Sequence, residues 1–217
     1  MRVIAGEARG RPLRATAETR PTADLIKGVI FSMLEALAYK RGFAPDEEGA
    51  LAAALAWPRV LDLFAGSGAL GIEALSRGAQ SAEFVEQGRE AARIIGHNLR
   101  TTGLEARAHI TCAPAAVALA GLDGPVDLAF ADPPYQDAAA LEQTVELLGR
   151  PGRLRPSSVV VLEQPATAEP PPSVGALPLN KTRRHGRTRV SLYATEEVWT
   201  EATVVERPRP DRGGATC

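Results

Sequence analysis

Two short stretches of the 217-residue chain carry residues whose types and spacing suit chemistry. Residues 60–71 contain the pattern G-x-G-x-x-G, and residues 126–135 end in Asp-Pro-Pro-Tyr. Each stretch is an apolar run that ends in a loop, which is typical of a parallel strand covered on both faces. Ligands of open parallel sheets bind outside the carboxyl ends of the strands. We therefore expect both loops to face one crevice, the first holding a nucleoside-bearing cofactor and the second the group that reacts with it.

The first loop combines glycines with two carboxylates. Gly66, Gly68 and Gly71 allow a tight turn and a close approach of the backbone to a ligand, between a strand and a helix. Glu86 ends the next expected strand, where an acid accepts hydrogen bonds from ribose hydroxyls. Taken alone, this pattern suggests a nicotinamide enzyme. Asp62, inside the first strand, instead suits the ammonium and sulfonium charges of S-adenosylmethionine. The alternative is that Asp62 caps a turn and the glycines only pack the helix on the strand.

The second loop, Asp132-Pro133-Pro134-Tyr135, is the more specific signal. The two prolines lack N–H donors and fix φ, so Asp132 and the nearby carbonyls are presented rigidly. An aromatic amine is a poor nucleophile because its lone pair is delocalised into the ring. A carboxylate and a carbonyl that accept from its N–H groups free that lone pair, and Tyr135 can stack on the base for roughly 1–3 kcal/mol. The sequence thus predicts catalytic roles for these four residues in methyl transfer to an amine. The alternative is a strand-end turn with a packing tyrosine.

Alternating strands and helices are expected to position these loops. The predicted strands are residues 59–64, 81–86, 106–112, 126–131 and 157–163, and the predicted helices are 69–77, 88–102, 114–120 and 138–149. Such alternation implies right-handed crossovers and a doubly wound α/β fold. Apolar residues at helical spacing predict a further helix over 24–37, and residues 176–179 and 189–193 favour a closing antiparallel pair.

This pattern divides the chain into four parts. Residues 1–37 form a basic extension, with a short hairpin near Val3, and a helix. Residues 38–58 form a loop or insert, residues 59–198 form the main domain, and residues 199–217 form a tail that we expect to be disordered.

Composition excludes several classes of protein. The chain is 45% hydrophobic and 24% charged, as in ordinary globular proteins. No apolar run approaches the ~18–20 residues that span a bilayer, so we expect no membrane partner. Cys112 and Cys217 give neither a disulfide framework nor a zinc spacing, which favours a reducing, cytoplasmic location. Cys112 is expected in the core, and no metal site is expected.

The net charge of −1 conceals two basic segments. Five cations without an acid fall within nine residues: Lys181, Arg183, Arg184, Arg187 and Arg189. Five arginines concentrate at the other end of the chain: Arg2, Arg9, Arg11, Arg14 and Arg20. Such clusters are the electrostatic footprint of phosphate binding. The alternative is a solvated face.

These motifs together resemble class I S-adenosylmethionine-dependent methyltransferases, and most closely the RsmD family, across most of residues 2–195. The resemblance is carried by Arg2-Val3-Ile4-Ala5-Gly6, Arg20-Pro21-Thr22, residues 61–71 with Glu73-Ala74-Leu75-Ser76-Arg77-Gly78, Val85-Glu86, Asn98-Leu99, Asp132-Pro133-Pro134-Tyr135 and Arg184-His185-Gly186 with Thr188. It implies a Rossmann-like, seven-stranded, mainly parallel sheet with an antiparallel last strand. It also implies methylation of a guanine N2 amine in 16S ribosomal RNA, within the small ribosomal subunit or an assembly intermediate. We expect a monomer, although the sequence itself does not determine the oligomeric state.

The resemblance also assigns binding residues. The cofactor contacts it implies are Asp62, Phe64, Ala65, Gly66, Ser67, Gly68, Gly71, Glu86, Gln87, Ala113 and Asp132. The RNA contacts it implies are Arg9, Arg11, Arg20, Thr22, Arg184, His185 and Arg187.

The chain departs from the family pattern at three places. Leu25-Ile26-Lys27-Gly28 replaces an Arg-rich, acid-containing helix start, and residues 38–58 are longer than usual. The family's adenine contact falls on Pro114, so that contact would come from backbone near Ala113 or Ala115.

Three other functions remain open at the level of sequence. Other amine methyltransferases, acting on DNA adenine or protein glutamine, use this loop type, usually with Asn first for glutamine. A non-catalytic RNA-binding protein could keep the same fold, and it would bind S-adenosylmethionine without turnover on any RNA. A nicotinamide dehydrogenase is the most distant alternative.

Overall fold

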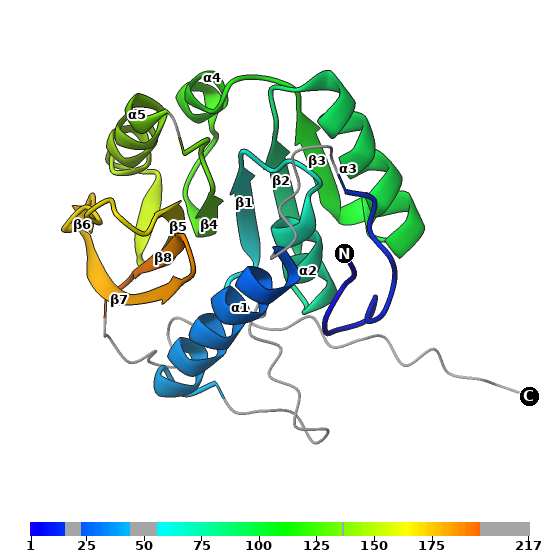
Figure 1. Cartoon of the computed structure of the whole chain (residues 1–217), viewed down its shortest axis with the longest axis horizontal. Helices are drawn as coiled ribbons and strands as arrows, with labels where there is room; N and C mark the ends of the chain where they lie inside the picture. The colour runs from blue at the N-terminus through cyan, green and yellow to red at the C-terminus, as the bar shows by residue number, and fades with distance from the viewer. Residues whose placement is uncertain (16–22, 44–55, 136, 196–217) are drawn as a thin grey trace, which may run out of the picture.

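The computed structural model describes residues 1–15, 23–43, 56–135 and 137–195, and it shows a sheet with helices on both faces (Figure 1). In the described residues the sheet has eight strands in the order β3-β2-β1-β4-β5-β8-β7-β6. The strands are β1 Arg59–Leu63, β2 Ser81–Val85, β3 Ala108–Thr111, β4 Val126–Ala131, β5 Leu154–Pro165, β6 Ser173–Val174, β7 Leu177–His185 and β8 Thr188–Tyr193. The helices are α1 Ala23–Lys40, α2 Ala69–Ser76, α3 Arg89–Thr102, α4 Ala115–Gly121 and α5 Ala138–Leu148, with a 3-10 turn at Glu105–Arg107.

The sheet confirms the expected Rossmann-like, mainly parallel architecture with an antiparallel strand, with one difference in strand number. Strands β1 to β5 are parallel, and β8 is antiparallel to both of its neighbours, β5 and β7. The predicted count of seven strands is wrong by one, because the two-residue β6 pairs with β7 through Val174 and Leu177. A strand of two residues is too short to produce an alternating pattern in the sequence.

Helix α1 extends three residues beyond its predicted end at residue 37, to Lys40. It ends where Gly42 adopts a positive φ of 91° and the Phe43 N–H donates to the Ala38 carbonyl at 3.0 Å. The helix is thus terminated by a residue in the left-handed conformation, a position at which glycine is favoured. The predicted insert 38–58 therefore begins inside α1. Near the other end of this range, the side chain of Trp57 is fully buried.

Two apolar cores lie on the two faces of the sheet. Helices α1, α2 and α3 contribute to one core together with β4 residues such as Phe130, whose ring centroid is 5.9 Å from that of Phe31. Helices α4 and α5 contribute to the other core, with alternate β4 residues such as Ala129. The period-2 alternation of a strand buried on both faces therefore positions the residues that precede the second loop.

The N-terminal segment, residues 1–15, folds back as a hairpin onto α2. Its backbone N–H groups at Ile4 and Ala5 donate to the two oxygens of the fully buried Glu73, at 2.8 and 2.9 Å. Lys27 from α1 and Arg77, which directly follows α2, form ion pairs with the same carboxylate, at 3.3 and 2.8 Å. Because a buried charge is costly unless it is paired, this network fixes the basic extension to the domain.

Among the described residues, no helix is both long and apolar enough to cross a membrane. Within the same residues, no group of three or more His, Cys, Asp or Glu side chains is arranged to hold a metal ion.

Candidate active site

The two loops singled out in the sequence lie at one edge of the sheet. Strand β1 pairs in parallel with both β2 and β4, and Leu63 at its end is in register with Val85 and Ala131. The glycine loop after β1, Glu86 after β2 and the Asp-Pro-Pro-Tyr loop after β4 therefore begin side by side. This is the position at which open parallel sheets bind ligands.

The backbone of the glycine loop requires its glycines for two different reasons. Gly66 and Gly68 have positive φ values of 55° and 76°, a conformation that costs other residues energy. At Gly71 a Cβ atom would lie only 2.4 Å from Cε1 of Phe84, so the start of α2 packs directly on β2. Phe64 also has a positive φ, 56°, which is an uncommon strain for a bulky residue and is typical of functional loops.

Asp62 is deeply buried and lies near two other acidic side chains. Its side chain is 2% exposed, and Oδ2 accepts a hydrogen bond from the Gly71 N–H at 2.9 Å. Burial is the main reason that the pKa of Asp62 is raised to about 8; the nearby charges of Asp132 and Glu86 also raise the pKa, and the Gly71 hydrogen bond opposes the rise. Among the described residues, no cation pairs with this carboxylate.

The structure therefore contains the turn-capping contact that was the alternative interpretation of Asp62. It also leaves a carboxylate whose ionised form needs a cation. The ammonium and sulfonium groups of S-adenosylmethionine fit this requirement, whereas the pyrophosphate of a nicotinamide cofactor would add to the negative charge.

Glu86 ties the ends of β1 and β2 together. Its Oε2 accepts from the Gly66 N–H at 2.8 Å, and its Oε1 accepts from the Gly88 N–H at 2.7 Å. Each carboxylate oxygen keeps acceptor capacity beyond one such bond, so Glu86 can hold the loop and still accept from ribose hydroxyls. The predicted contacts Ala65 and Ser67 lie in the same loop, between the residues that Glu86 and Asp62 anchor.

The remaining predicted cofactor contacts lie beyond β2 and β3. Gln87 is exposed directly after Glu86, and Ala113 is half-buried before α4. The Ala113 N–H donates to the Thr111 carbonyl at 3.1 Å, so Ala113 can offer a ligand only its carbonyl. Pro114 precedes the first residue of α4, Ala115, whose N–H lies in the first turn, where backbone N–H groups have no partner inside the helix.

The Asp-Pro-Pro-Tyr loop is anchored through the hydroxyl of Tyr135. Asp132 and Tyr135 are half-buried, Pro133 is buried and Pro134 is exposed. The Tyr135 hydroxyl lies 2.7 Å from Oγ1 of Thr188, the first residue of β8. Thr188 is only 5% exposed, so the loop is anchored to a strand that follows it by more than fifty residues in the sequence.

The second basic segment is carried by β7, β8 and the turn between them. Arg184, His185 and Arg187 are exposed around this turn, in which Gly186 has a positive φ of 55°. The register pairs His185 with Thr188, the residue that contacts Tyr135. The predicted RNA-binding turn therefore adjoins the predicted catalytic loop.

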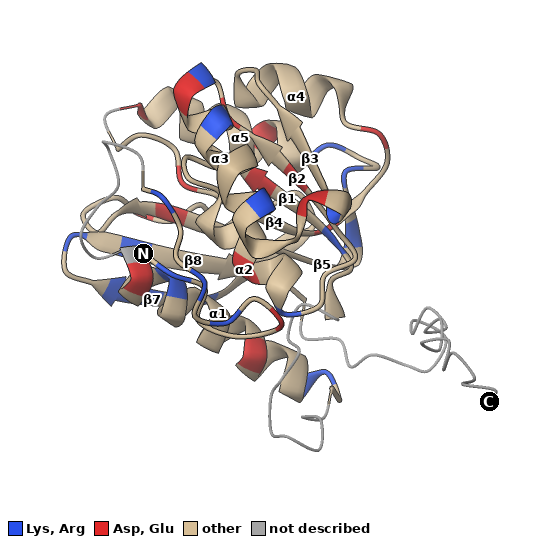
Figure 2. Ribbon diagram, turned by 90° about the vertical axis from the view of Figure 1, so that its right-hand side faces the viewer, with Lys and Arg blue, Asp and Glu red and all other residues tan. Residues whose placement is uncertain are grey.

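The first basic segment is described only in part. Arg9 and Arg11 are exposed on the N-terminal hairpin, whereas Arg20 and Thr22 lie outside the described residues. In Figure 2 the N-terminal hairpin, with its blue Lys and Arg positions, lies on the same side of the view as β7.

Two residues at the site were not predicted from the sequence as site residues. Thr188 orients Tyr135, as described above. Asn98 on α3 is fully buried, and its Nδ2 donates to the carbonyls of Ser67, at 2.9 Å, and Arg14, at 3.0 Å. Its Oδ1 accepts from the Arg14 N–H at 2.8 Å. A polar residue on the buried face of an otherwise amphipathic helix was the signal that could have identified it.

One minor expectation was wrong. Cys112 is exposed rather than buried in the core, because β3 ends at Thr111 and Cys112 begins the loop beyond it.

Comparison with known proteins identifies the family. A family model described as "Conserved hypothetical protein 95" matches residues 1–194. The chain is similar to "Putative rRNA methyltransferase YlbH" of Bacillus subtilis, with 35% identity over 89% of this chain and 98% of that protein. It is also similar to "Ribosomal RNA small subunit methyltransferase D" of Escherichia coli K12, with 31% identity over 90% of both chains.

A solved structure supports the same assignment. "Putative methyltransferase yhhF from Escherichia coli" superposes with a TM-score of 0.72 at 30% identity and covers 89% of this chain and 96% of that one. The match extends over the N-terminal hairpin, the glycine loop and the Asp-Pro-Pro-Tyr loop. The chain therefore belongs to the RsmD family of methyltransferases.

Proposed function

We propose that this protein transfers a methyl group from S-adenosylmethionine to the exocyclic N2 amine of a guanine in 16S ribosomal RNA. The observation that carries the proposal is the meeting of three features at one sheet edge. These are the glycine loop with its unpaired buried carboxylate Asp62, the acceptor Glu86, and the rigid loop from Asp132 to Tyr135. The relatives named as ribosomal RNA methyltransferases support RNA as the substrate.

Residues of the first loop would hold the cofactor. Glu86 would accept from the ribose hydroxyls, Asp62 would attract the cationic amino acid portion, and the turn from Phe64 to Gly68 would approach it with its backbone. Gln87 and the Ala113 carbonyl would border the adenine. When bound, S-adenosylmethionine would supply an electrophilic methyl group on its sulfonium.

The second loop would act on the amine. Asp132 and a carbonyl of the Pro133-Pro134 turn accept hydrogen bonds from the two N–H groups, which draws the nitrogen towards sp³ geometry and frees its lone pair. The amine proton becomes acidic only as the new N–C bond forms, so a strongly basic group is not required. Tyr135, oriented by Thr188, would stack on the base.

The basic segments would hold the RNA backbone. Arg184, His185 and Arg187 surround the turn beside Tyr135, and Arg9 and Arg11 lie on the hairpin that Asn98 connects to the glycine loop. Phosphate contacts from such exposed cations position a nucleic acid without reading its sequence. We propose the small ribosomal subunit or an assembly intermediate as the form in which this RNA is met, and a monomer as the acting species.

The deciding experiment is methyl transfer to small ribosomal subunits from a strain that lacks the enzyme, with labelled S-adenosylmethionine and nucleoside analysis of the product. The expected product is N2-methylguanosine. Recovery of N6-methyladenine from DNA would instead support the adenine-methylating alternative. Binding of S-adenosylmethionine without transfer to any RNA would support a non-catalytic RNA-binding protein.

A further inference from the structure

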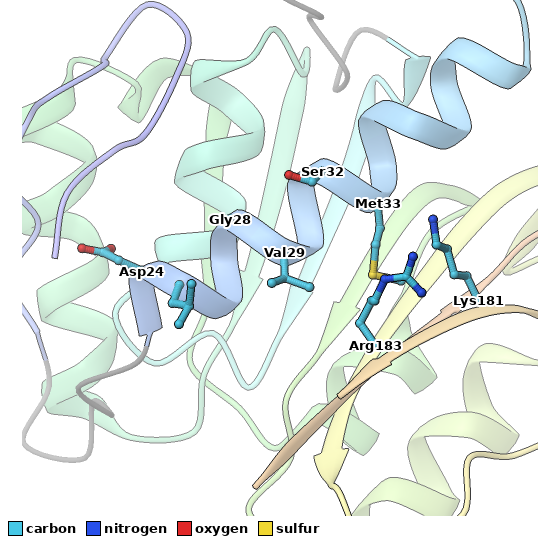
Figure 3. A pocket seen from close by; sticks show the side chains of 8 residues that line it. Asp24, Gly28, Val29, Ser32, Met33, Lys181 and Arg183 are labelled. Atoms are coloured by element: carbon cyan, nitrogen blue, oxygen red, sulfur yellow. The ribbon is translucent and has the colours of Figure 1, made fainter. Parts of the chain in front are cut away.

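An open groove of about 460 Å³ lies between α1 and β7, and its lining includes none of the predicted RNA contacts Arg184, His185 and Arg187 (Figure 3). The apolar side chains of Leu25, Val29 and Met33 line its α1 side around Gly28, and Lys181 and Arg183 line its β7 side. Leu25 is 50% exposed in this groove. An apolar wall that faces two cations suits a ligand with both flat apolar and anionic parts.

Gly28 is the first indication that the groove serves a ligand. Glycine in a helix interior is destabilising relative to alanine, and a protein usually tolerates it where a side chain would clash. A Cβ atom at Gly28 would meet nothing within 4 Å, so packing does not require a glycine here. The absent side chain instead widens the groove at its centre.

The cations of β7 are the second indication. Lys181 and Arg183 are two residues apart on a strand and therefore share one face. Their cross-strand partners, Leu192 and Val190, belong to the apolar core that α1 covers, which confirms that this face is the one towards α1. Among the described residues, no carboxylate forms an ion pair with Lys181 or Arg183.

The groove also connects the second basic segment, to which Lys181 and Arg183 belong, with the N-terminal hairpin. At its α1 end, Asp24 accepts from the Arg2 N–H of the N-terminal hairpin at 3.4 Å. At its β7 end, the face that carries Lys181 and Arg183 continues to His185, which pairs with Thr188 beside Tyr135. A polymer with regularly spaced anions could therefore follow β7 from the groove to the proposed reactive loop.

We propose that this groove binds a single-stranded segment of RNA next to the target nucleotide, with a base against Leu25 and Val29 and phosphates at Lys181 and Arg183. This proposal rests on the proposed function, because the RNA is the same substrate. A protein helix is a poorer match, because its anions depend on particular acidic side chains, whereas every nucleotide of an RNA strand carries a phosphate.

The test is to fill the groove without disturbing the fold. Gly28→Leu places a good helix former into open space, so α1 should not lose stability. Affinity for small-subunit RNA should fall roughly tenfold, with KM for the particle raised and kcat little changed. The matched control is Gly121→Leu. A Cβ atom added at Gly121 would also meet nothing within 4 Å, but Gly121 lies on α4, which packs on the opposite face of the sheet. The control should bind RNA as the parent does.

A second set of variants tests the cations. Lys181→Gln and Arg183→Gln should each lower the dependence of RNA affinity on salt by about 0.7 in the log–log slope, as expected for one lost contact to a single strand. Affinity for S-adenosylmethionine, measured by calorimetry, should stay at the parent value in all four variants.

A photocrosslinker at Leu25 then identifies the occupant. We expect a nuclease-sensitive crosslink to 16S RNA in small-subunit particles. Two outcomes would overturn the groove proposal: a crosslink to a ribosomal protein, or an RNA affinity of Gly28→Leu equal to that of the parent. Neither outcome would affect the proposed function if the parent enzyme still methylates RNA. Failure of the parent to methylate any RNA would instead overturn the proposed function, and the comparison of RNA binding between Gly28→Leu and Gly121→Leu would still decide the groove.

Discussion

At the scale of single residues, the site depends on carboxylates kept in different surroundings. Burial raises the pKa of Asp62 to about 8, Glu86 is held by two backbone N–H groups, and Asp132 is half-buried at a strand end. Because these surroundings differ, we expect the three side chains to serve three different roles at one sheet edge. Two predictions follow from this difference.

The first prediction concerns Asp62 and pH. Its pKa in the folded protein is about 8, against an ordinary value of 3.8. The folded state thus binds a proton that the unfolded state releases, so the stability of the free protein falls as pH rises through this window, by about 1.4 kcal/mol per pH unit. Asp62→Asn still accepts from the Gly71 N–H and should lose this dependence. Urea unfolding of both proteins across the window measures it, and parallel curves would show that Asp62 is ionised in the free protein.

The second prediction separates the roles of Asp132 and Tyr135. Asp132→Ala should reduce turnover by roughly 10²–10⁴-fold, the range for a positioned proton acceptor, and leave cofactor affinity nearly intact. Tyr135→Phe keeps the ring, loses only the contact with Thr188 and should be mild. Tyr135→Ala loses stacking, so its defect should appear mainly as weaker RNA binding.

The measurement for both residues is steady-state transfer to small-subunit particles, together with calorimetric binding of the cofactor. Methylation by Asp132→Ala at the parent rate would contradict the mechanism. A larger loss of activity in Tyr135→Phe than in Tyr135→Ala would contradict the stacking role of Tyr135.

At the scale of elements, the N-terminal hairpin is part of the domain rather than a loose arm. Its backbone contacts α2 through Glu73 and Ser76, and the Ala8 N–H donates to Ser76 Oγ at 3.0 Å. Asn98 then connects the end of the hairpin at Arg14 to the glycine loop at Ser67. The position of the hairpin and the shape of the glycine loop are therefore coupled through α3.

The third prediction uses two glycines of this hairpin as a matched pair. Gly6 and Gly10 both have a φ of +82°, but a Cβ at Gly6 would lie 1.8 Å from the Ser76 carbonyl oxygen, whereas a Cβ at Gly10 would meet nothing within 4 Å. Gly10→Ala should cost only the conformational strain, about 1–2 kcal/mol. Gly6→Ala should cost a further ~1–3 kcal/mol, because the hairpin must move away from α2. Equal losses in urea unfolding would show that the hairpin shifts without cost.

At the scale of the whole molecule, positive and negative charges nearly balance in number, but the cations gather in two segments of the chain. The net charge is only −1, yet exposed cations of the N-terminal hairpin and of β7 lie on one side of the view in Figure 2. A nucleic acid responds to the local field within about a Debye length, roughly 8–10 Å in ordinary buffers. A net charge near zero therefore does not exclude RNA binding by local clusters of cations.

The fourth prediction tests this surface. Arg184→Gln and Arg187→Gln should each weaken RNA binding and lower the salt slope by about 0.7, with unchanged affinity for the cofactor. Arg150→Gln is the matched control. It removes one exposed cation that follows α5, at the edge of the sheet away from the carboxyl ends of the strands. Indistinguishable salt slopes for the three variants would leave these arginines as a solvated face.

The local features of this protein could be predicted from its sequence. Strands β1 and β4, the loops that follow them and the alternation with α2 to α5 were all predicted within a few residues, because a buried strand and an amphipathic helix each leave a periodic pattern over a short window. The meeting of the glycine loop, Glu86 and Asp132 followed from the rule that parallel strands end at one edge of the sheet.

Contacts between distant segments were decided by the tertiary structure alone. The sheet order inserts β8 between β5 and β7, and the hydroxyl contact between Tyr135 and Thr188 joins two separate segments of the chain. The hydrogen bonds from Asn98 to the carbonyls of Arg14 and Ser67 join residues that are 84 and 31 positions apart in the sequence. Likewise, only the complete fold excludes water from Asp62 and raises its pKa to about 8. Periodicity is a property of neighbours in sequence, whereas desolvation and side-chain pairing depend on which segments meet in space.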